Sequence, residues 1–221
     1  MIGQMPVADV NTHRSSAELR ADQAESRWQD RLPVLTGTRV RLRELQPADA
    51  AMLISLTTEE MTRFISPPPA TVEGFERFIA WTLRERARGA FVGYAVTVHG
   101  LDTPVGIFQV RRLDRHFETA EWGFALASSF WGTGVFEEGA WLMLNFVFNT
   151  LKVHRLEARA ALKNGRGNGA LLKMGAVQEG ILRKSLLHKG QYLDQVMYSI
   201  LNEDWQVRAA AARVAERIPV H

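Results

Sequence analysis

The chain has 221 residues, 46% of them hydrophobic and 23% charged, a composition typical of a globular protein with one domain and an appendage. It contains no cysteine, which excludes disulfides, cysteine-ligated zinc, iron–sulfur clusters and a thiol nucleophile. The net charge of +3 is too small for a dedicated nucleic-acid binder, and no apolar run can span a membrane, so we expect a cytoplasmic protein.

The first 30 residues are polar and mix acidic with basic side chains, which is not the pattern of a signal peptide. A surface helix is possible over residues 16–28, and we expect residues 1–33 to form an extension that is partly helical or mobile. From Thr38 to Arg43 apolar and charged residues alternate, which predicts a half-buried strand.

Two helices and a loop are predicted next. Pro47 and Asp49 stand at the start of a helix that runs to about Leu56, because proline and an acidic residue both favour a first helical turn. The prolines at 67–69 exclude helix and predict a loop. A second helix begins near Thr71, since apolar residues follow it at helical spacing.

The rest of the chain alternates strands with helices. Aromatic and β-branched residues predict three antiparallel strands, with turns at residues 100–102 and near Asp114: Phe91–Val98, Val105–Arg111 and Thr119–Leu126. A glycine turn, an apolar helix over 135–151 and a strand over 155–161 then form a βαβ-like unit. A loop and short helix over 164–174, strands over 177–182 and 192–201, and a C-terminal helix follow. We expect one mixed α/β, α+β-like domain over residues 34–205, with a helical tail over 206–221.

The turn Gly132–Gly134 is the most informative local motif. Two glycines after a strand allow a tight turn, and the first N–H groups of the following helix have no partner inside it. These donors and the helix dipole favour an anion such as a pyrophosphate. The spacing excludes a Walker loop and a dinucleotide fingerprint. A plain glycine turn without a ligand is the alternative interpretation.

The order of these motifs resembles the GNAT acetyltransferases, specifically the RimJ/RimL-like branch that acetylates protein N-termini and other primary amines. The resemblance runs from Leu35 to Trp205, and its motifs are the opening strand with Asp49, Trp122–Leu126 followed by Phe130–Gly134, His154–Ala158, and Asn164 followed by Leu171–Gly175. It implies the GNAT acyl-CoA N-acyltransferase fold. In that fold a twisted, mostly antiparallel sheet is splayed at the acyl-CoA strand and flanked by helices.

The resemblance also implies acetyl-CoA as the acyl donor and no metal. The backbone of Phe124 and Leu126 is expected to pair with the pantetheine arm, and the Asn164 side chain to contact the donor. The pyrophosphate is expected to bind the backbone N–H groups of Trp131, Gly132, Thr133, Gly134 and Val135.

Several positions depart from the family pattern. Phe136 is bulky where the phosphate loop enters its helix, and we expect it to affect how closely the phosphates approach. Gly167 replaces a serine, and Leu172 lies where a tyrosine or glutamate is usual, so the usual acid for the departing thiolate is missing. Alternating glycines at 165, 167 and 169 are expected to loosen the start of the short helix.

A general base is expected, because an amine arrives protonated at neutral pH and must lose a proton before it attacks a thioester. Glu121, on the strand that carries the acyl group, is the candidate base; a strand residue paired with an arginine is the alternative. His116 and Glu118 are weaker candidates, and His154 is better explained as structural. Tyr198 is a weak candidate acid, since a tyrosine in a closing strand is usually part of the core.

The predicted function is transfer of acetyl from acetyl-CoA to a primary amine, on a protein N-terminus or a small molecule, by direct attack in a ternary complex. The alternative is a non-catalytic acyl-CoA-binding sensor or partner module, which the missing acid keeps open. A third interpretation takes the arginines between residues 84 and 115 as an RNA surface, although a solvated face explains them more simply. Relatives include dimers, so a homodimer is a further possibility.

Overall fold

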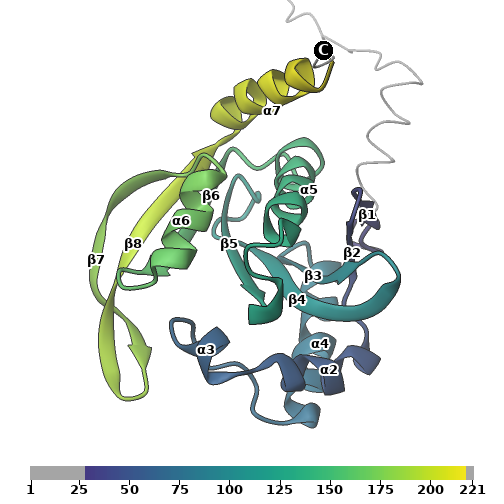
Figure 1. Ribbon diagram of the computed structural model, residues 1–221, viewed down its shortest axis with the longest axis vertical. Coiled ribbons are helices and arrows are strands. Elements are labelled where there is room, and N and C mark those ends of the chain that lie inside the picture. The colour runs from purple at the N-terminus through teal and green to yellow at the C-terminus, as the bar shows by residue number, and fades with distance from the viewer. Residues whose placement is uncertain (1–27, 218–221) are drawn as a thin grey trace, which may run out of the picture.

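The computed structural model describes residues 28–217, with side chains to residue 214. The fold is built on one eight-stranded sheet, whose strands lie in the order β1-β2-β3-β4-β5-β6-β8-β7 (Figure 1). Neighbouring strands are antiparallel except β5 and β6, which are parallel. The strands are β1 (Leu35–Thr36), β2 (Val40–Glu44), β3 (Phe91–Val98), β4 (Leu101–Arg112), β5 (Thr119–Leu126), β6 (Arg155–Ala161), β7 (Val177–His188) and β8 (Gln191–Leu201). The α-helices are α2 (Ala50–Leu56), α3 (Glu59–Thr62), α4 (Val72–Ala87), α5 (Val135–Asn149), α6 (Gly165–Lys173) and α7 (Asn202–Arg217).

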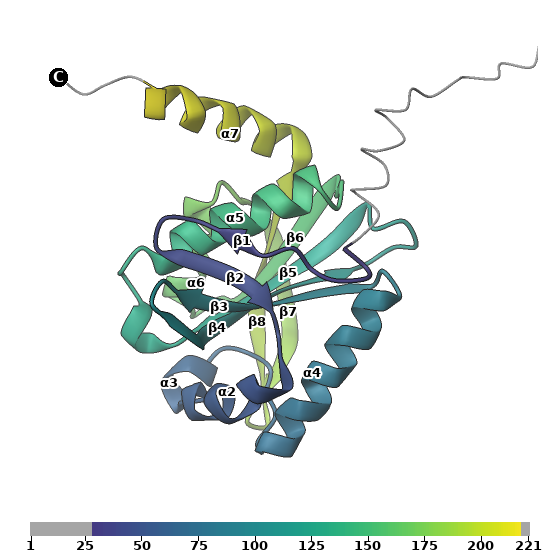
Figure 2. The same cartoon turned by 90° about the vertical axis from the view of Figure 1, so that its right-hand side faces the viewer.

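Helices cover both faces of the sheet. Figure 2 shows α5 on one face and α2 with α4 on the other. The larger core lies against α5 and includes the fully buried Phe108, Leu144 and Leu156. A smaller core under α2 and α4 contains Leu45 and Ile79. This arrangement confirms the expected mixed α/β fold. None of the helices in the described part of the chain is long and apolar enough to cross a membrane.

The segment ahead of β1 contributes to the core. Trp28 packs edge-on against Phe117 with ring centroids 5.7 Å apart, and Leu32 is almost completely buried. Both residues precede residue 34, where the domain was expected to begin. Most of the predicted surface helix over 16–28 falls outside the described residues. The division into an extension, a domain and a tail therefore stays a prediction.

Most predicted strands are present, and three of them (β3, β5 and β6) have the predicted bounds. β4 begins at Leu101, because the turn before it consists of His99 and Gly100 alone, with Gly100 at a φ of +84°. The prediction that this turn reaches Asp102 is wrong. The glycine takes up the reversal in a conformation that other residues rarely adopt.

The closing hairpin is longer than predicted, and one helix was not predicted. β7 continues to His188, where Lys189 and Gly190, both with positive φ, form the turn into β8. The unpredicted helix, α3, has four residues, too few to show an apolar periodicity.

A buried ion pair holds β2 to the short helical segment Pro47–Asp49. The Arg43 guanidinium donates to both carboxylate oxygens of Asp49, at 2.8 and 2.7 Å, and to the Asp102 carbonyl oxygen at 2.6 Å. The side chains of Arg43 and Asp49 are 6% and 5% exposed. The hydrogen bonds that Arg43 donates to Asp49 raise the pKa of the guanidinium and outweigh burial, which opposes its charge.

The sheet is splayed where β5 and β6 separate. The two strands pair only from Thr119 to Trp122 on β5, and β6 continues beside β8 instead. The edge of β5 from Gly123 to Leu126 that faces away from β4 therefore has no strand partner among the described residues. This gap confirms the splay expected in the sheet and positions the site described next.

Candidate functional site

A cavity of about 670 Å³ lies at the end of β5, bounded by α3, α6 and the start of α5. Figure 1 shows α6 and α3 one above the other beside β5. The apolar lining from β5 is buried or half-buried, whereas the charged lining residues are exposed. These charged residues are Glu60, Arg63, Glu137, Arg166 and Lys173. Within the described range, no three His, Asp or Glu side chains gather where they could hold a metal ion.

The glycine turn forms one wall of this cavity. Gly132 and Gly134 have φ values of +73° and +84°, and Gly134 is the N-cap of α5. No side chain caps this helix, whereas Thr71 and Asn164 cap α4 and α6 through their own oxygen atoms. The N-terminal N–H groups of α5 are therefore left for a ligand.

The free donors begin at Gly132. The Trp131 N–H donates to Ser128 O at 3.1 Å, so this predicted phosphate donor already has an acceptor. The next N–H group with an acceptor is that of Glu138, which donates to Gly134 O at 3.1 Å. The amides from Gly132 to Glu137 are thus available, and they include the other predicted donors, Thr133, Gly134 and Val135.

An arginine from β2 braces the outside of the turn. Arg39 Nη1 donates to Thr133 O at 3.1 Å, and Arg39 Nε lies 3.3 Å from Glu138 Oε2. Burial disfavours the charged form of Glu138, but the N–H groups of Arg39 and Val40 outweigh it and lower the pKa of this carboxyl. Glu138 is therefore an anion directed toward β2 and away from the cavity.

The backbone of β5 presents hydrogen-bonding groups to the gap. Ala127 N donates to Val105 O on β4, so by alternation the backbone groups of Phe124 and Leu126 face the opposite edge. Trp131 Nε1 donates to the Leu126 carbonyl oxygen at 2.9 Å. The Phe124 N–H and C=O and the Leu126 N–H are left for an extended ligand, as the predicted pantetheine contact requires.

Phe136 packs away from the phosphate loop. Its ring lies 4.8 Å from that of Phe124 and 5.8 Å from that of Phe108, in an aromatic cluster between the sheet and α5. The bulk that was expected to affect the phosphates is therefore taken up by the apolar wall. Packing against these aromatic rings stabilises the large Phe136 side chain in the first turn of α5.

α6 begins as a regular helix despite its three glycines. Asn164 Oδ1 accepts from Gly167 N at 2.9 Å, and no described residue accepts from Asn164 Nδ2, while Asn164 itself lines the cavity. A Cβ on Gly167 would lie 2.5 Å from Asn164 Nδ2, so the glycine leaves room for this amide. Leu172 is 55% exposed and does not line the cavity, so a tyrosine here would also point to solvent.

Glu121, the candidate base, is held in ion pairs. Its carboxylate contacts Arg111 from β4 and lies 3.6 Å from Arg159 Nε on β6. It lies two residues before the gap, on the part of β5 that still pairs with β6, and is not part of the cavity wall. The structure thus shows the arginine pairing that was the alternative interpretation of this residue.

Tyr198, the weak candidate acid, is a core residue. Its side chain is buried, and its hydroxyl donates to Asn168 Oδ1 at 3.1 Å. Asn168 in turn donates to Asn164 O at 2.8 Å. Burial raises the pKa of Tyr198, and this chain of hydrogen bonds supports the start of α6 from behind.

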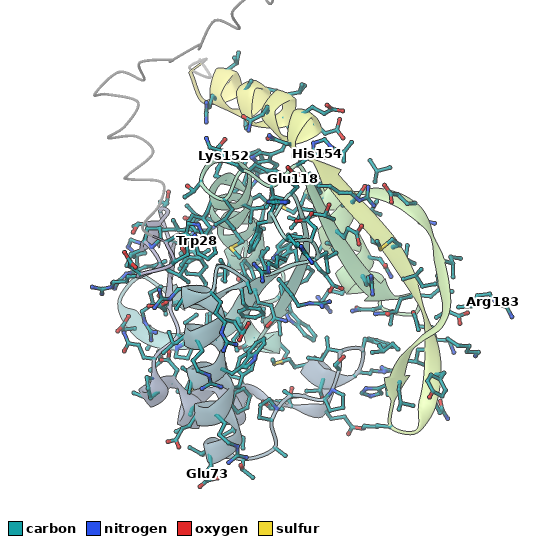
Figure 3. The ribbon with its side chains drawn as sticks, turned by 180° about the vertical axis from the view of Figure 1, so that it is seen from behind. Trp28, Glu73, Glu118, Lys152, His154 and Arg183 are labelled. Carbon is teal, nitrogen blue, oxygen red and sulfur yellow. The ribbon has the colours of Figure 1, made fainter. Side chains whose placement is uncertain are left out.

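The weaker candidates lie at the other end of the sheet. Figure 3 shows Glu118 and His154 beside each other, and His154 N donates to Glu118 O at 2.8 Å. Both precede strands β5 and β6, so the length of β5, roughly 25 Å, separates them from the cavity. His116 is in the same loop. None of these residues can reach a ligand in the cavity.

Sequence reasoning missed the wall contributed by α3 and its loop. Glu60 and Arg63 line the cavity, and the Arg63 guanidinium lies 5.2 Å from the Phe64 ring. The side chain at Lys189 in the closing hairpin pairs with Glu59 at 2.6 Å, which ties α3 to this position. The sequence gives no local signal for the role of Glu60 and Arg63, because their place in the cavity wall depends on contact between α3 and the distant β7–β8 hairpin.

Comparison with known proteins identifies relatives of the whole domain. A family profile described as an acetyltransferase (GNAT) domain matches residues 39–177. Uncharacterized N-acetyltransferase p20 from Bacillus licheniformis is 24% identical over 169 residues, covering 76% of this chain and 95% of that protein. The [Ribosomal protein uS5]-alanine N-acetyltransferase of Escherichia coli (strain K12) is 26% identical over 89 residues, or 40% of this chain and 46% of that protein.

A solved structure shares the fold. Mycobacterium smegmatis RimJ in complex with CoA-disulfide superposes with a TM-score of 0.70 at 21% identity. The superposition covers 81% of this chain and 92% of that chain.

Proposed function

The chain belongs to the GNAT acetyltransferases, in their RimJ/RimL-like branch, and from this premise we propose that it transfers acetyl from acetyl-CoA to a primary amine. It is an acyltransferase by family. The donor and the acceptor are the parts of this proposal that the site must support.

The observation that carries the proposal is the uncapped start of α5 beside an unpaired edge of β5. The free amides from Gly132 to Glu137 and the helix dipole suit a pyrophosphate. The backbone groups of Phe124 and Leu126 suit the amides of a pantetheine arm. One cavity joins the two, and Asn164 is among the residues that line it.

Bound acetyl-CoA supplies a thioester carbonyl, and the protein must orient an amine toward it. Holding the two reactants together in a ternary complex provides much of the acceleration without a covalent enzyme intermediate. Free N–H groups at the β5 edge are placed to stabilise negative charge on the attacked oxygen. Gly167 supplies no acid to the cavity and Leu172 does not line it, so the thiolate is expected to leave with a proton from water.

Glu121 stays the proposed base, and one substitution tests it. Glu121→Gln removes the proton acceptor and keeps the side-chain volume, so we expect kcat to fall at least tenfold while acetyl-CoA affinity stays the same. Wild-type kcat across the pH range would assign Glu121 to its ion pairs with Arg111 and Arg159 alone.

The acceptor is proposed to be a protein N-terminus or a small amine. A ribosomal-protein alanine is the acceptor named for the Escherichia coli relative, which supports the first of these. A thiol-release assay with acetyl-CoA, run against a panel of N-terminal peptides and small amines, tests the function. Release with at least one acceptor supports the enzyme, whereas binding of acetyl-CoA without release for any acceptor supports a sensor or partner module.

A further inference from the structure

We propose that Arg166 binds the 3′-phosphate of CoA at the exposed mouth of the cavity. The proposal rests on the proposed function, because it places a second anionic group of the same donor. It adds a recognition site to α6 that is separate from the amides of the glycine turn.

The Arg166 side chain is exposed and stacked on an aromatic ring. Its guanidinium carbon lies 4.2 Å from the centre of the Trp131 ring, and the residue is exposed at the cavity wall. Among the described residues no carboxylate or carbonyl accepts from it. A guanidinium stacked by its flat face keeps its N–H edge free for the two oxygens of a phosphate.

The Trp131 ring beneath Arg166 is fixed by two hydrogen bonds. Trp131 N donates to Ser128 O at 3.1 Å, and Trp131 Nε1 donates to Leu126 O at 2.9 Å. Trp131 directly precedes Gly132, the first of the free amides. The stack therefore holds Arg166 beside the phosphate loop, so the side chain loses little conformational entropy when an anion binds.

The cavity offers three kinds of chemistry. The half-buried Phe124 and Phe136 give it an apolar lining, the glycine turn gives it free amides, and the exposed Arg166 stacks on Trp131, the residue before the turn. CoA carries three groups that match them: an acyl-pantetheine arm, a pyrophosphate, and a ribose that carries a phosphate monoester. The amides account for the pyrophosphate, so the monoester is the anion that remains for a cation at the mouth.

The other cations of the cavity are placed differently. Arg63 lies on the α3 side over Phe64, and Lys173 lies two turns from Arg166 along α6, about 10 Å away. Among the described residues no aromatic ring lies against Lys173, and neither cation stacks on Trp131 as Arg166 does. Arg63 is therefore a matched control: an arginine on an aromatic ring in the same cavity wall.

The test compares CoA with 3′-dephospho-CoA by titration calorimetry on the full chain. For the wild type we expect CoA to bind roughly tenfold to a hundredfold more tightly, the effect of a charge-assisted hydrogen-bonded pair. Arg166→Gln should reduce this ratio to within about threefold by weakening CoA alone, with dephospho-CoA unaffected. Arg63→Gln should keep the wild-type ratio, and Arg166→Lys should restore part of it.

The outcomes separate this inference from the proposed function. Equal affinity of the wild type for both ligands, or an unchanged ratio in Arg166→Gln, overturns the assignment of Arg166 and leaves the proposed function standing. Failure of the wild type to bind either ligand overturns both. An equal loss of the ratio in Arg63→Gln and Arg166→Gln would show a general charge effect of the cavity, and would overturn a specific site.

Discussion

Gly134 provides the sharpest test of the phosphate loop, because the fold contains a glycine with the same conformation far from the site. Gly134 and Gly100 both have a φ of +84°. A Cβ on Gly134 would lie 2.5 Å from Arg39 Nη2, so this guanidinium must leave Thr133, whereas a Cβ on Gly100 meets nothing within 4 Å. Gly100→Ala therefore reproduces the backbone strain of Gly134→Ala without touching the loop.

The two alanine variants should lose similar stability and differ in binding. The left-handed conformation of the new alanine lowers the free energy of unfolding of each variant by about 1–2 kcal/mol. For a domain of this size that lowers the Tm by roughly 3–6 °C. Gly134→Ala also redirects the first free amides of α5. Since a hydrogen bond to a charged phosphate contributes about 1.5–3 kcal/mol, the loss of one should weaken acetyl-CoA binding tenfold or more. Gly100→Ala should bind like the wild type.

Gly134→Glu extends the series by placing a carboxylate beside the proposed pyrophosphate. Thermal unfolding establishes that each variant folds, and calorimetry then measures the Kd for acetyl-CoA. We expect no measurable binding by a folded Gly134→Glu protein. Wild-type affinity in both Gly134 variants would refute the assignment of the loop to the donor, whatever their stability.

Three further predictions concern the stability of the fold around the site, and each is checked by denaturant unfolding. Gly169→Ala should raise the free energy of unfolding by about 0.5–1 kcal/mol, because this helical glycine has open space around its Cβ position; a loss would show an unseen contact. Asp49→Ala should cost about 3 kcal/mol by leaving Arg43 buried without its main partner, whereas the exposed Asp102→Ala should cost less than about 1 kcal/mol, and equal costs would contradict the burial argument. Arg155 and Ser199 lower the pKa of Glu179 to about 2, so its stabilisation is complete above the ordinary value of 4.5 and lost as the pH falls toward 2. Glu179→Gln should flatten this acid-dependent loss, and an unchanged slope would contradict it.

The sequence predicts the elements whose signals are local. β3 is a continuous run of β-branched, aromatic and small residues, β5 is interrupted only by Glu121 before its final leucine, and the structure gives both strands the predicted bounds. The turn at Gly132–Gly134 is likewise recognisable from the residues at its own positions. These features depend on backbone conformation within a few residues, which composition and spacing report directly.

The missing parts depend on contacts between distant segments. α3 has no periodicity of its own, and its place in the cavity wall follows from the approach of the β7–β8 hairpin. Glu121 shows the same limit, because the strand position suggests a base while the neighbouring strands supply Arg111 and Arg159. The family resemblance placed Leu172 where an acid is usual, and in the structure this residue of α6 is exposed and does not line the cavity.

The most direct test of the account is a calorimetric titration of the wild-type protein with acetyl-CoA and with free CoA. The uncapped start of α5 and the open edge of β5 predict binding of both ligands at one site per chain, with a Kd in the micromolar range. Absence of binding at millimolar ligand would mean that these groups do not form a donor site, and would contradict the proposed function at its first step.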